Sequence, residues 1–186
     1  LFRSGICMLR GEEDYESYFE DTLKAGHYEN DRDAVDLMIR SSQDIIRELV
    51  DFGVEFERHQ GEFAYTKEGA HTASRILHHE DLTGKEITSK LLARVKERDN
   101  ISLYDHTTMV DLLERDNVCY GVMVSCADGS TQKLYCDYTI WACGGVGGLY
   151  KHSTNYPHLT GDTIALSVKH KIELKDVSYV QIHPTT

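Results

Sequence analysis

The chain has few prolines, few basic residues and no long apolar stretch. Only two prolines occur among 186 residues, and no repeat or low-complexity linker divides the chain, so we expect one domain with its own core. No apolar run approaches the ~20 residues that a membrane span requires, and no segment has the pattern of a charged-then-apolar leader. These absences predict a cytoplasmic protein without a membrane span.

Basic residues are outnumbered, with 20 Lys and Arg against 31 Asp and Glu, and the formal charge is -11. The acidic residues are spread along the chain rather than collected in a tail. A surface of this kind favours solubility and repels nucleic acids and anionic membranes. We therefore expect neither as a partner.

The cysteines do not form a metal-binding or disulfide pattern. They are five in number and include no C-x-x-C pair: Cys7, Cys119, Cys126, Cys136 and Cys143. Four of them fall in segments with a strand-like pattern, where a free cysteine behaves as a small apolar residue. Disulfide and zinc interpretations are therefore disfavoured.

Apolar residues recur at helical spacing in the first hundred positions. They predict one helix over Glu12–Gly26 and a second over Arg32–Phe52, capped by Asn30 or Asp31. The second helix carries an apolar stripe that must pack on something: Val35, Met38, Ile39, Ile45, Ile46 and Leu49. A third helix is predicted from Thr83, whose hydroxyl can cap it.

From Ile101 the pattern changes to strands. Five runs are predicted: Ile101–Tyr104, Thr107–Glu114, Cys119–Cys126, Thr131–Tyr135 and Tyr138–Cys143. Turn residues at Asp116-Asn117 and Asp128-Gly129 would join them in a small antiparallel meander. The last run is apolar almost throughout, as expected of a strand covered on both faces. A helix at Asp162–His170 and a strand at Val177–Ile182 complete an α+β or α/β pattern.

Polar groups of several kinds gather in the segment Thr66–Arg75, namely a carboxylate, an imidazole, hydroxyls and a guanidinium. Such a segment is either a ligand-binding loop or a solvated connection, and both interpretations stay open. The adjacent His78-His79 does not predict a metal site, because neighbouring residues diverge on any regular element and no partner spacing exists.

Glycines follow the last predicted strand of the meander, at Gly144-Gly145-Val146-Gly147-Gly148. They are not a dinucleotide fingerprint, because a G-x-G-x-x-G motif begun at Gly145 would need glycine at Tyr150. The cluster is either a tight turn or a loop whose bare backbone admits a planar or phosphorylated ligand. Asp162 precedes a predicted helix, where it can cap the helix, contact a ribityl or ribose hydroxyl, or do both.

The segment Gln181-Ile182-His183-Pro184 has paired polar residues. Residues two apart on an extended segment point to the same side, so Gln181 and His183 present two neutral hydrogen-bond donors together. Paired donors suit a carboxylate.

Six motifs in one order resemble the L-aspartate oxidase family, within the fumarate reductase and succinate dehydrogenase flavoprotein superfamily. They span essentially the whole chain: Glu20–Gly26, Glu68–Thr72 with Arg75–His78, Asp81–Gly84, Ala142–Gly145, Ser153–Asn155 with Gly161-Asp162, and Gln181–Thr185. The resemblance implies oxidation of L-aspartate to iminoaspartate by noncovalent FAD, on the route to quinolinate and NAD. The loop at Glu68 favours this family over the dicarboxylate enzymes, which carry a different Arg- and Gly-rich loop there.

The resemblance also implies site residues. Glu68 would orient the substrate amino group, and Gln181 and His183 would donate to its carboxylates. FAD contacts are implied at Ser4, Gly5, Thr108, Met109, Cys143, Gly144 and Asp162. The family usually has Gly at the position of Ser4 and Thr at the position of Cys143, so this chain departs from the pattern at both.

The resemblance implies an incomplete enzyme. Residues 1–176 would form part of an FAD-binding domain without its opening βαβ dinucleotide motif, and residues 177–186 would begin a capping domain. The catalytic arginine is expected beyond Thr186, so no catalytic residue is assigned, and we expect the chain alone to bind FAD weakly and to be inactive.

Partners and alternatives follow from the same resemblance. Quinolinate synthase is a candidate partner of the parent enzyme, and truncated surfaces predict self-association. Two other interpretations stay open: a fragment of a fumarate- or succinate-specific flavoprotein, and a non-catalytic module that binds a ligand by itself.

Overall fold

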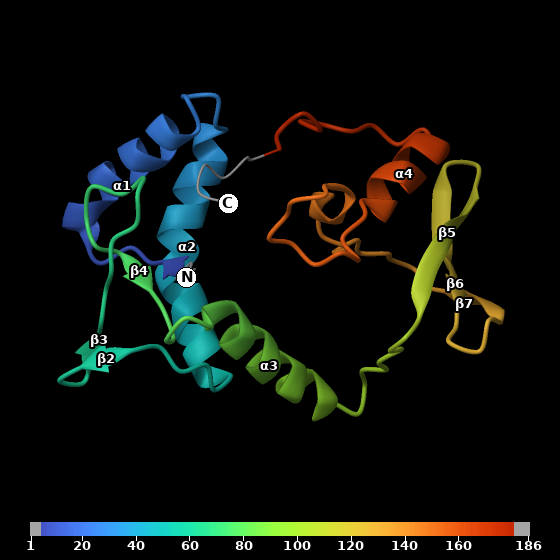
Figure 1. Cartoon of the computed structure of the whole chain (residues 1–186), viewed down its shortest axis with the longest axis horizontal. Helices are drawn as coiled ribbons and strands as arrows, with labels where there is room; N and C mark the ends of the chain where they lie inside the picture. The colour runs from blue at the N-terminus through green and yellow to red at the C-terminus, as the bar shows by residue number, and fades with distance from the viewer. Residues whose placement is uncertain (1–4, 181–186) are drawn as a thin grey trace. The chain divides into compact units, whose positions relative to one another are not determined.

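A computed structural model describes residues 5–180 of the chain (Figure 1). The chain divides into two compact units, Leu1–Leu103 and Tyr104–Thr186, called unit 1 and unit 2 below. The domain boundary expected after residue 176 stays a prediction.

Unit 1 combines helices with very short strands. The helices are α1 (Glu12–Ala25), α2 (Arg32–Asp51) and α3 (Thr83–Lys96), and the strands are β1 (Ile6–Cys7), β2 (Arg58–His59), β3 (Glu62–Phe63) and β4 (Ile76–Leu77). Strand β1 pairs antiparallel with β4, and β2 pairs antiparallel with β3. The first two predicted helices are confirmed. Asp31 caps α2, because its Oδ1 accepts the backbone N–H groups of Asp33 and Ala34 at 3.0 and 3.1 Å.

The predicted cap of the third helix is wrong by one residue. Leu82 occupies the N-cap position and Thr83 is already helical. The Thr83 hydroxyl instead accepts the backbone N–H of His79 at 3.0 Å, in the turn that precedes the helix. This bond orients the turn that leads into α3. It does not satisfy any of the free N–H groups in the first turn of the helix.

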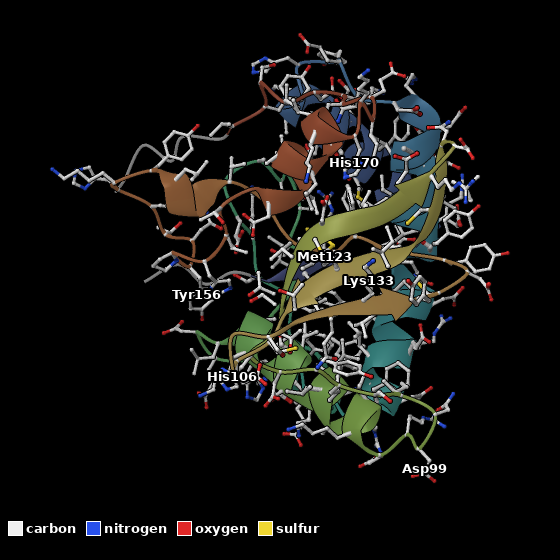
Figure 2. All side chains as sticks on the ribbon, turned by 90° about the vertical axis from the view of Figure 1, so that its right-hand side faces the viewer. Asp99, His106, Met123, Lys133, Tyr156 and His170 are labelled. Carbon is white, nitrogen blue, oxygen red and sulfur yellow. The ribbon has the colours of Figure 1, made fainter. Side chains whose placement is uncertain are left out.

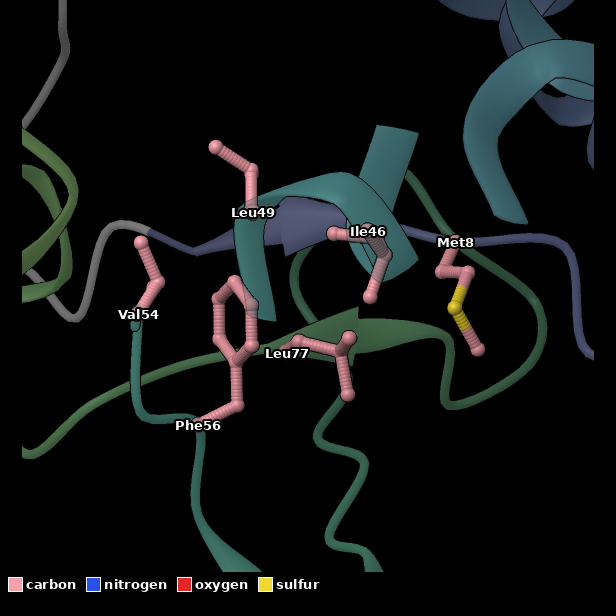
Figure 3. Close-up of a cluster of buried hydrophobic side chains, with 6 residues drawn as sticks. All are labelled: Met8, Ile46, Leu49, Val54, Phe56 and Leu77. Carbon is pink, nitrogen blue, oxygen red and sulfur yellow. The ribbon is translucent and has the colours of Figure 1, made fainter. Parts of the chain in front are cut away.

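Two apolar clusters form the core of unit 1. Figure 3 shows the first, which contains Met8, Ile46, Leu49, Val54, Phe56 and Leu77, and the second contains Leu9, Tyr18, Leu23, Val35 and Ile39. Helix α2 contributes to both, so its predicted stripe is largely confirmed. Met38 and Ile45 are the exceptions, because their side chains are 47% and 46% exposed.

Unit 2 contains the predicted antiparallel meander. Its strands β5 (Thr108–Arg115), β6 (Val118–Ser125) and β7 (Thr131–Tyr135) are adjacent in that order, and a short 3-10 helix (Gly147–Leu149) and α4 (Asp162–Lys169) follow. Asp116 and Asn117 have φ angles of 55° and 63°, as the hairpin turn requires. Figure 2 labels Met123 and Lys133, which are cross-strand partners in β6 and β7.

Three predicted strands are absent from the residues that the structure describes. The segments 101–104 and 138–143 have no strand pairing, and neither does 177–180, the described part of Val177–Ile182. Tyr138 and Ile140 are 89% and 90% exposed, so the expectation of a strand covered on both faces is wrong for this chain. An apolar run becomes a strand only when a neighbour accepts its backbone hydrogen bonds, and no described strand does so here.

Candidate functional site

The Glu68 loop of unit 1 has a closed base. Thr66 and Ile76 exchange both backbone hydrogen bonds, at 2.9 and 3.1 Å, so residues 67–75 form a loop between two paired positions. Within it, the backbone N–H of His71 donates to the Glu68 carbonyl at 3.1 Å. This bond makes Glu68–His71 a tight turn, called the Glu68 turn below.

Arg75 lies beneath the loop and is 0% exposed. Its Nη2 and Nε donate to both oxygens of Asp14, at 2.8 and 3.2 Å, and its Nη1 donates to Asp21 at 2.6 Å. Nη2 also donates to the Ser17 hydroxyl at 2.8 Å, and the guanidinium lies 4.9 Å from the centre of the Tyr18 ring. Among the residues between 5 and 180, helix α1 therefore supplies every partner of this buried cation except His71.

One oxygen of Asp21 collects three donors. Its Oδ2 accepts the backbone N–H of Thr72 at 2.7 Å, the Thr72 hydroxyl at 2.8 Å and Arg75 Nη1 at 2.6 Å. Burial by itself raises the pKa of this carboxyl, but the donors from Thr72 and Arg75 outweigh burial and hold the pKa below its usual value. Asp21 is therefore an anion at neutral pH, and it joins α1 to the loop.

His71 has a defined tautomer. Arg75 Nη1 lies 3.0 Å from His71 Nδ1, and because an arginine can only donate, Nδ1 must be the acceptor. The proton is then on Nε2, which donates to Cys7 Sγ at 3.4 Å. Burial and the Arg75 charge lower the pKa of His71, and burial raises the pKa of Cys7. The pair is a neutral imidazole and a neutral thiol, which is the opposite of an activated cysteine nucleophile.

A cavity of about 510 Å³ opens beside this network. Its lining includes Gly5, where an FAD contact is predicted, and Ala70 and His71 from the loop. Met38 and Ile45, the exposed members of the α2 stripe, also line it. The structure thus brings one predicted cofactor residue and the C-terminal end of the Glu68 turn to the same cavity. Glu68 itself is exposed.

Unit 2 carries the other described FAD candidates. Thr108 and Met109 begin β5, and Cys143 and Gly144 lie exposed after the unpaired segment 138–142. Asp162 is the first residue of α4, and the N-cap is Gly161 with a φ of 72°, so of the interpretations left open for Asp162 the helix cap is excluded. Its exposed carboxylate accepts the Thr160 hydroxyl at 2.8 Å.

The glycines of the cluster in unit 2 differ in their surroundings. A Cβ on Gly147 would lie 2.4 Å from Asn155 Nδ2, and one on Gly148 would lie 2.5 Å from the Pro157 carbonyl oxygen. A Cβ on Gly145 would meet nothing within 4 Å. A Cβ on Gly144, where φ is 73°, would lie 2.9 Å from Leu159 Cδ2. Gly147 and Gly148 therefore pack on the chain that follows and Gly144 packs on Leu159, whereas Gly145 leaves its backbone open to a ligand. Together with the exposed Asp162 carboxylate, this open backbone suits the phosphate and hydroxyl groups of FAD.

Asp111 joins the two elements of unit 2 that carry the predicted FAD contacts. It accepts hydrogen bonds from Lys169 Nζ at 2.6 Å and from His170 Nε2 at 2.7 Å, so it fastens the C-terminal end of α4 to strand β5. These two hydrogen bonds lower the pKa of Asp111 to about 2. Glu114 Oε2 lies 3.7 Å from the other ring nitrogen of His170.

Several expectations lie outside these observations. Ser4, Gln181 and His183 fall outside the described residues. Between residues 5 and 180, no group of three or more His, Cys, Asp or Glu is arranged to hold a metal ion. No helix in the same range is long and apolar enough to cross a membrane.

Sequence reasoning missed the network around Arg75. Asp14, Tyr18 and Asp21 recur at helical spacing, on the same face of α1, and all three are buried. Two carboxylates on the apolar face of a helix require a buried cation, and this pattern was the available signal.

The chain belongs to the family of FAD binding domains, whose model matches residues 3–186. It is 45% identical over 185 residues to the L-aspartate oxidase of Clostridium perfringens, and 37% identical to that of Clostridium acetobutylicum. Both alignments include 100% of this chain but only 42% and 43% of those proteins, so the chain spans less than half the length of these relatives. The resemblance found in the motifs is thus confirmed.

Solved structures support the fold. An E. coli quinol fumarate reductase aligns with a TM-score of 0.86 and 22% identity, over 90% of this chain and 29% of that protein. The predicted fold class, an FAD-binding domain of the fumarate reductase type with a small antiparallel meander, is confirmed.

Proposed function

We propose that this chain is part of an L-aspartate oxidase, which oxidises L-aspartate to iminoaspartate with FAD for quinolinate and NAD synthesis. The observation that carries the proposal is the 45% identity to such an enzyme over the whole chain. The closed, anchored turn at Glu68 supports it, because a dicarboxylate with an amino group needs one fixed anion.

Different residues of the chain would bind the substrate and the FAD. Bound FAD supplies the acceptor for a hydride from the substrate α-carbon. Glu68 would orient the substrate amino group, and Gln181 and His183 would donate hydrogen bonds to its carboxylates. FAD would be held in unit 2 by the Gly144 backbone, the Asp162 carboxylate, and Thr108, Met109 and Cys143. The family resemblance also implies FAD contacts at Ser4 and Gly5.

Residues 1–176 would be FAD-binding domain and residues 177–186 the start of a capping domain. The parent enzyme would be cytoplasmic and could contact quinolinate synthase. Large apolar side chains exposed on unit 2 favour self-association of the chain when it is produced alone.

Enzyme assays on a longer protein that contains these residues test the proposal. We expect turnover of L-aspartate and none of succinate. Glu68→Gln should lower kcat/KM for aspartate by about 10- to 100-fold, because the neutral amide removes the anionic partner of the amino group. Glu48→Gln, on the exposed side of α2, is the matched control and should change nothing. Turnover of succinate in place of aspartate would contradict the proposal and would favour a fumarate- or succinate-specific flavoprotein.

The chain produced alone gives a second test. We expect it to bind FAD weakly and to turn over no aspartate, because the expected catalytic arginine and dinucleotide motif are not among its residues. Flavin absorbance of the purified chain is the measurement. Stoichiometric flavin that survives gel filtration would contradict this expectation.

A further inference from the structure

We propose that Thr72, Asp21 and Arg75 form an anchor that positions Glu68 for the amino group of the substrate. This inference rests on the proposed function and assigns three positioning residues to it. Thr72 and Arg75 lie on the sequence segment that predicted the loop to be functional, Asp21 lies on α1, and none of the three needs to touch the substrate.

Glu68 has little packing of its own. Residues 67–70 are all exposed, and a Cβ on Gly69 would meet nothing within 4 Å. The turn bond from His71 N–H to the Glu68 carbonyl joins Glu68 to the residues that follow it. The position of Glu68 is therefore set mainly by what holds His71 and Thr72.

His71 and Thr72 are both held by hydrogen bonds that lead to Asp21 on α1. Thr72 donates its backbone N–H and its hydroxyl to Asp21 Oδ2, and Arg75 Nη1 contacts both Asp21 Oδ2 and His71 Nδ1. Asp21 is only 6% exposed and belongs to α1, two residues before the buried Leu23. The loop is thus attached to a rigid helix by charge-assisted hydrogen bonds, which are about twice as strong as neutral ones.

The hydrogen bond from the Thr72 hydroxyl to Asp21 can be removed without disturbing the core. The Thr72 side chain is exposed apart from its bond to Asp21, so replacing it removes one hydrogen bond without opening a cavity. Thr72→Val keeps the shape and loses the hydroxyl, whereas Thr72→Ser keeps the hydroxyl and loses a methyl group. The two variants therefore isolate the hydrogen bond.

Steady-state kinetics on the longer protein give the first readout. Thr72→Val should raise KM for L-aspartate roughly fivefold, the equivalent of one net hydrogen bond, and Thr72→Ser should stay within about twofold of the parent. The inhibition constant of succinate, which lacks the amino group, should be unchanged in both. A general loosening of the site would weaken succinate as well as aspartate, and that result would overturn the inference.

Limited trypsin digestion of the same protein gives a readout independent of activity. Lys67 is exposed beside the Glu68 turn, so cleavage after it reports the opening of the loop. We expect cleavage after Lys67 to be about fivefold faster in Thr72→Val than in Thr72→Ser, with equal cleavage after Lys96. Equal rates after Lys67 would overturn the anchor. Faster cleavage in a protein without aspartate turnover would instead reject the proposed function and retain the anchor as the support of the loop.

Discussion

Unit 1 and unit 2 differ in what they bury. Among the described residues, every buried apolar side chain except Val124 and Leu166 belongs to unit 1, as do the buried charges of Arg75, Asp14 and Asp21. Unit 2 has an ordered sheet, but large apolar side chains such as Ile140 lie in solvent, at 90% exposure.

This difference shows that a region can have regular secondary structure without a core, and a core with little regular sheet structure. Unit 1 has very short strands and nevertheless encloses two apolar clusters. Unit 2 has long hydrogen-bonded strands and little to cover them. Because soluble monomers rarely leave large contiguous apolar surfaces exposed, we expect unit 2 to depend on additional protein and unit 1 to fold by itself.

The largest expected effect is that of Arg75→Leu. It would leave Asp14 and Asp21 buried without their cation, and breaking such a pair costs about 3–5 kcal/mol of unfolding free energy. Urea unfolding followed by far-ultraviolet circular dichroism would show the loss, because three of the four described α-helices lie in unit 1. Arg47→Ala is the control, since its partner Asp44 is on the surface, and it should cost less than about 1 kcal/mol.

Trp141 is the single tryptophan and lies in unit 2. If its fluorescence transition shifted as much as the helical signal, the two units would not be independent.

Truncation of a buried apolar residue in unit 1 should lower the unfolding free energy much more than truncation of an exposed one in unit 2. This effect should be somewhat smaller than that of Arg75→Leu. Leu77→Ala removes a side chain that is 0% exposed in unit 1 and should cost about 3 kcal/mol. Ile140→Ala removes one that is 90% exposed in unit 2 and should change the unfolding free energy by less than about 0.5 kcal/mol. Light scattering should show less self-association of Ile140→Ala. A large loss of stability in that variant would mean that segment 138–143 is packed in solution.

Acid should weaken unit 2 through Asp111. Its carboxyl has a pKa of about 2 in the folded chain against an ordinary value of 3.8. A depressed pKa contributes stability that is present above about pH 4 and lost as the pH falls towards 2. The contribution should be about 1 kcal/mol, because the pair is partly solvated. Asp111→Asn should therefore flatten the acid dependence of the Trp141 transition in this window, whereas Asp116→Asn, on the exposed turn, should not. If the acid dependence were unchanged in Asp111→Asn, the hydrogen bonds that join β5 to α4 would not contribute to stability.

The helix caps give the smallest contrast. Asp31→Ala in unit 1 removes two hydrogen bonds to free N–H groups and should cost about 1 kcal/mol. Asp162→Ala in unit 2 should cost less than about 0.5 kcal/mol, because Gly161 holds the cap position and the lost partner is only the Thr160 hydroxyl. Urea unfolding of both variants is the measurement. Equal losses would show that Asp162 interacts with the α4 terminus more strongly than its contacts indicate.

The parts of the fold that were predictable depend on local pattern. Helices α1 and α2 follow from apolar spacing, and the meander follows from β-branched runs and from the turn at Asp116-Asn117. The segment 138–143 has the composition of a buried strand, but a strand also requires a neighbour, which local pattern does not supply. The cap predicted at Thr83 is misplaced by one residue, and Asp162, for which a cap was one open interpretation, is already helical. In both cases the backbone conformation of the preceding residue, Leu82 or Gly161, decides where the helix begins.

Only the exposed residues of the candidate site were predictable from the sequence. The motif pointed to Glu68 and to the exposed residues around it, since such residue types gather in binding loops. The anchor was not predictable from the loop, because Asp21 and Asp14 belong to a helix more than fifty positions earlier in the chain. Only the fold brings these carboxylates to Arg75.

That separation along the chain affects the order of folding. Asp21 and Thr72 are 51 residues apart, and Asp14 and Arg75 are 61 apart, so both contacts close long loops. Closing a long loop costs entropy before any contact compensates for it, and distant contacts therefore form slowly. Helices α1 and α2 can form as soon as their own residues are available, whereas the Glu68 turn must wait until Arg75 has reached α1. We therefore expect the turn to be among the last parts of unit 1 to acquire its native shape, long after the surrounding helices are ordered.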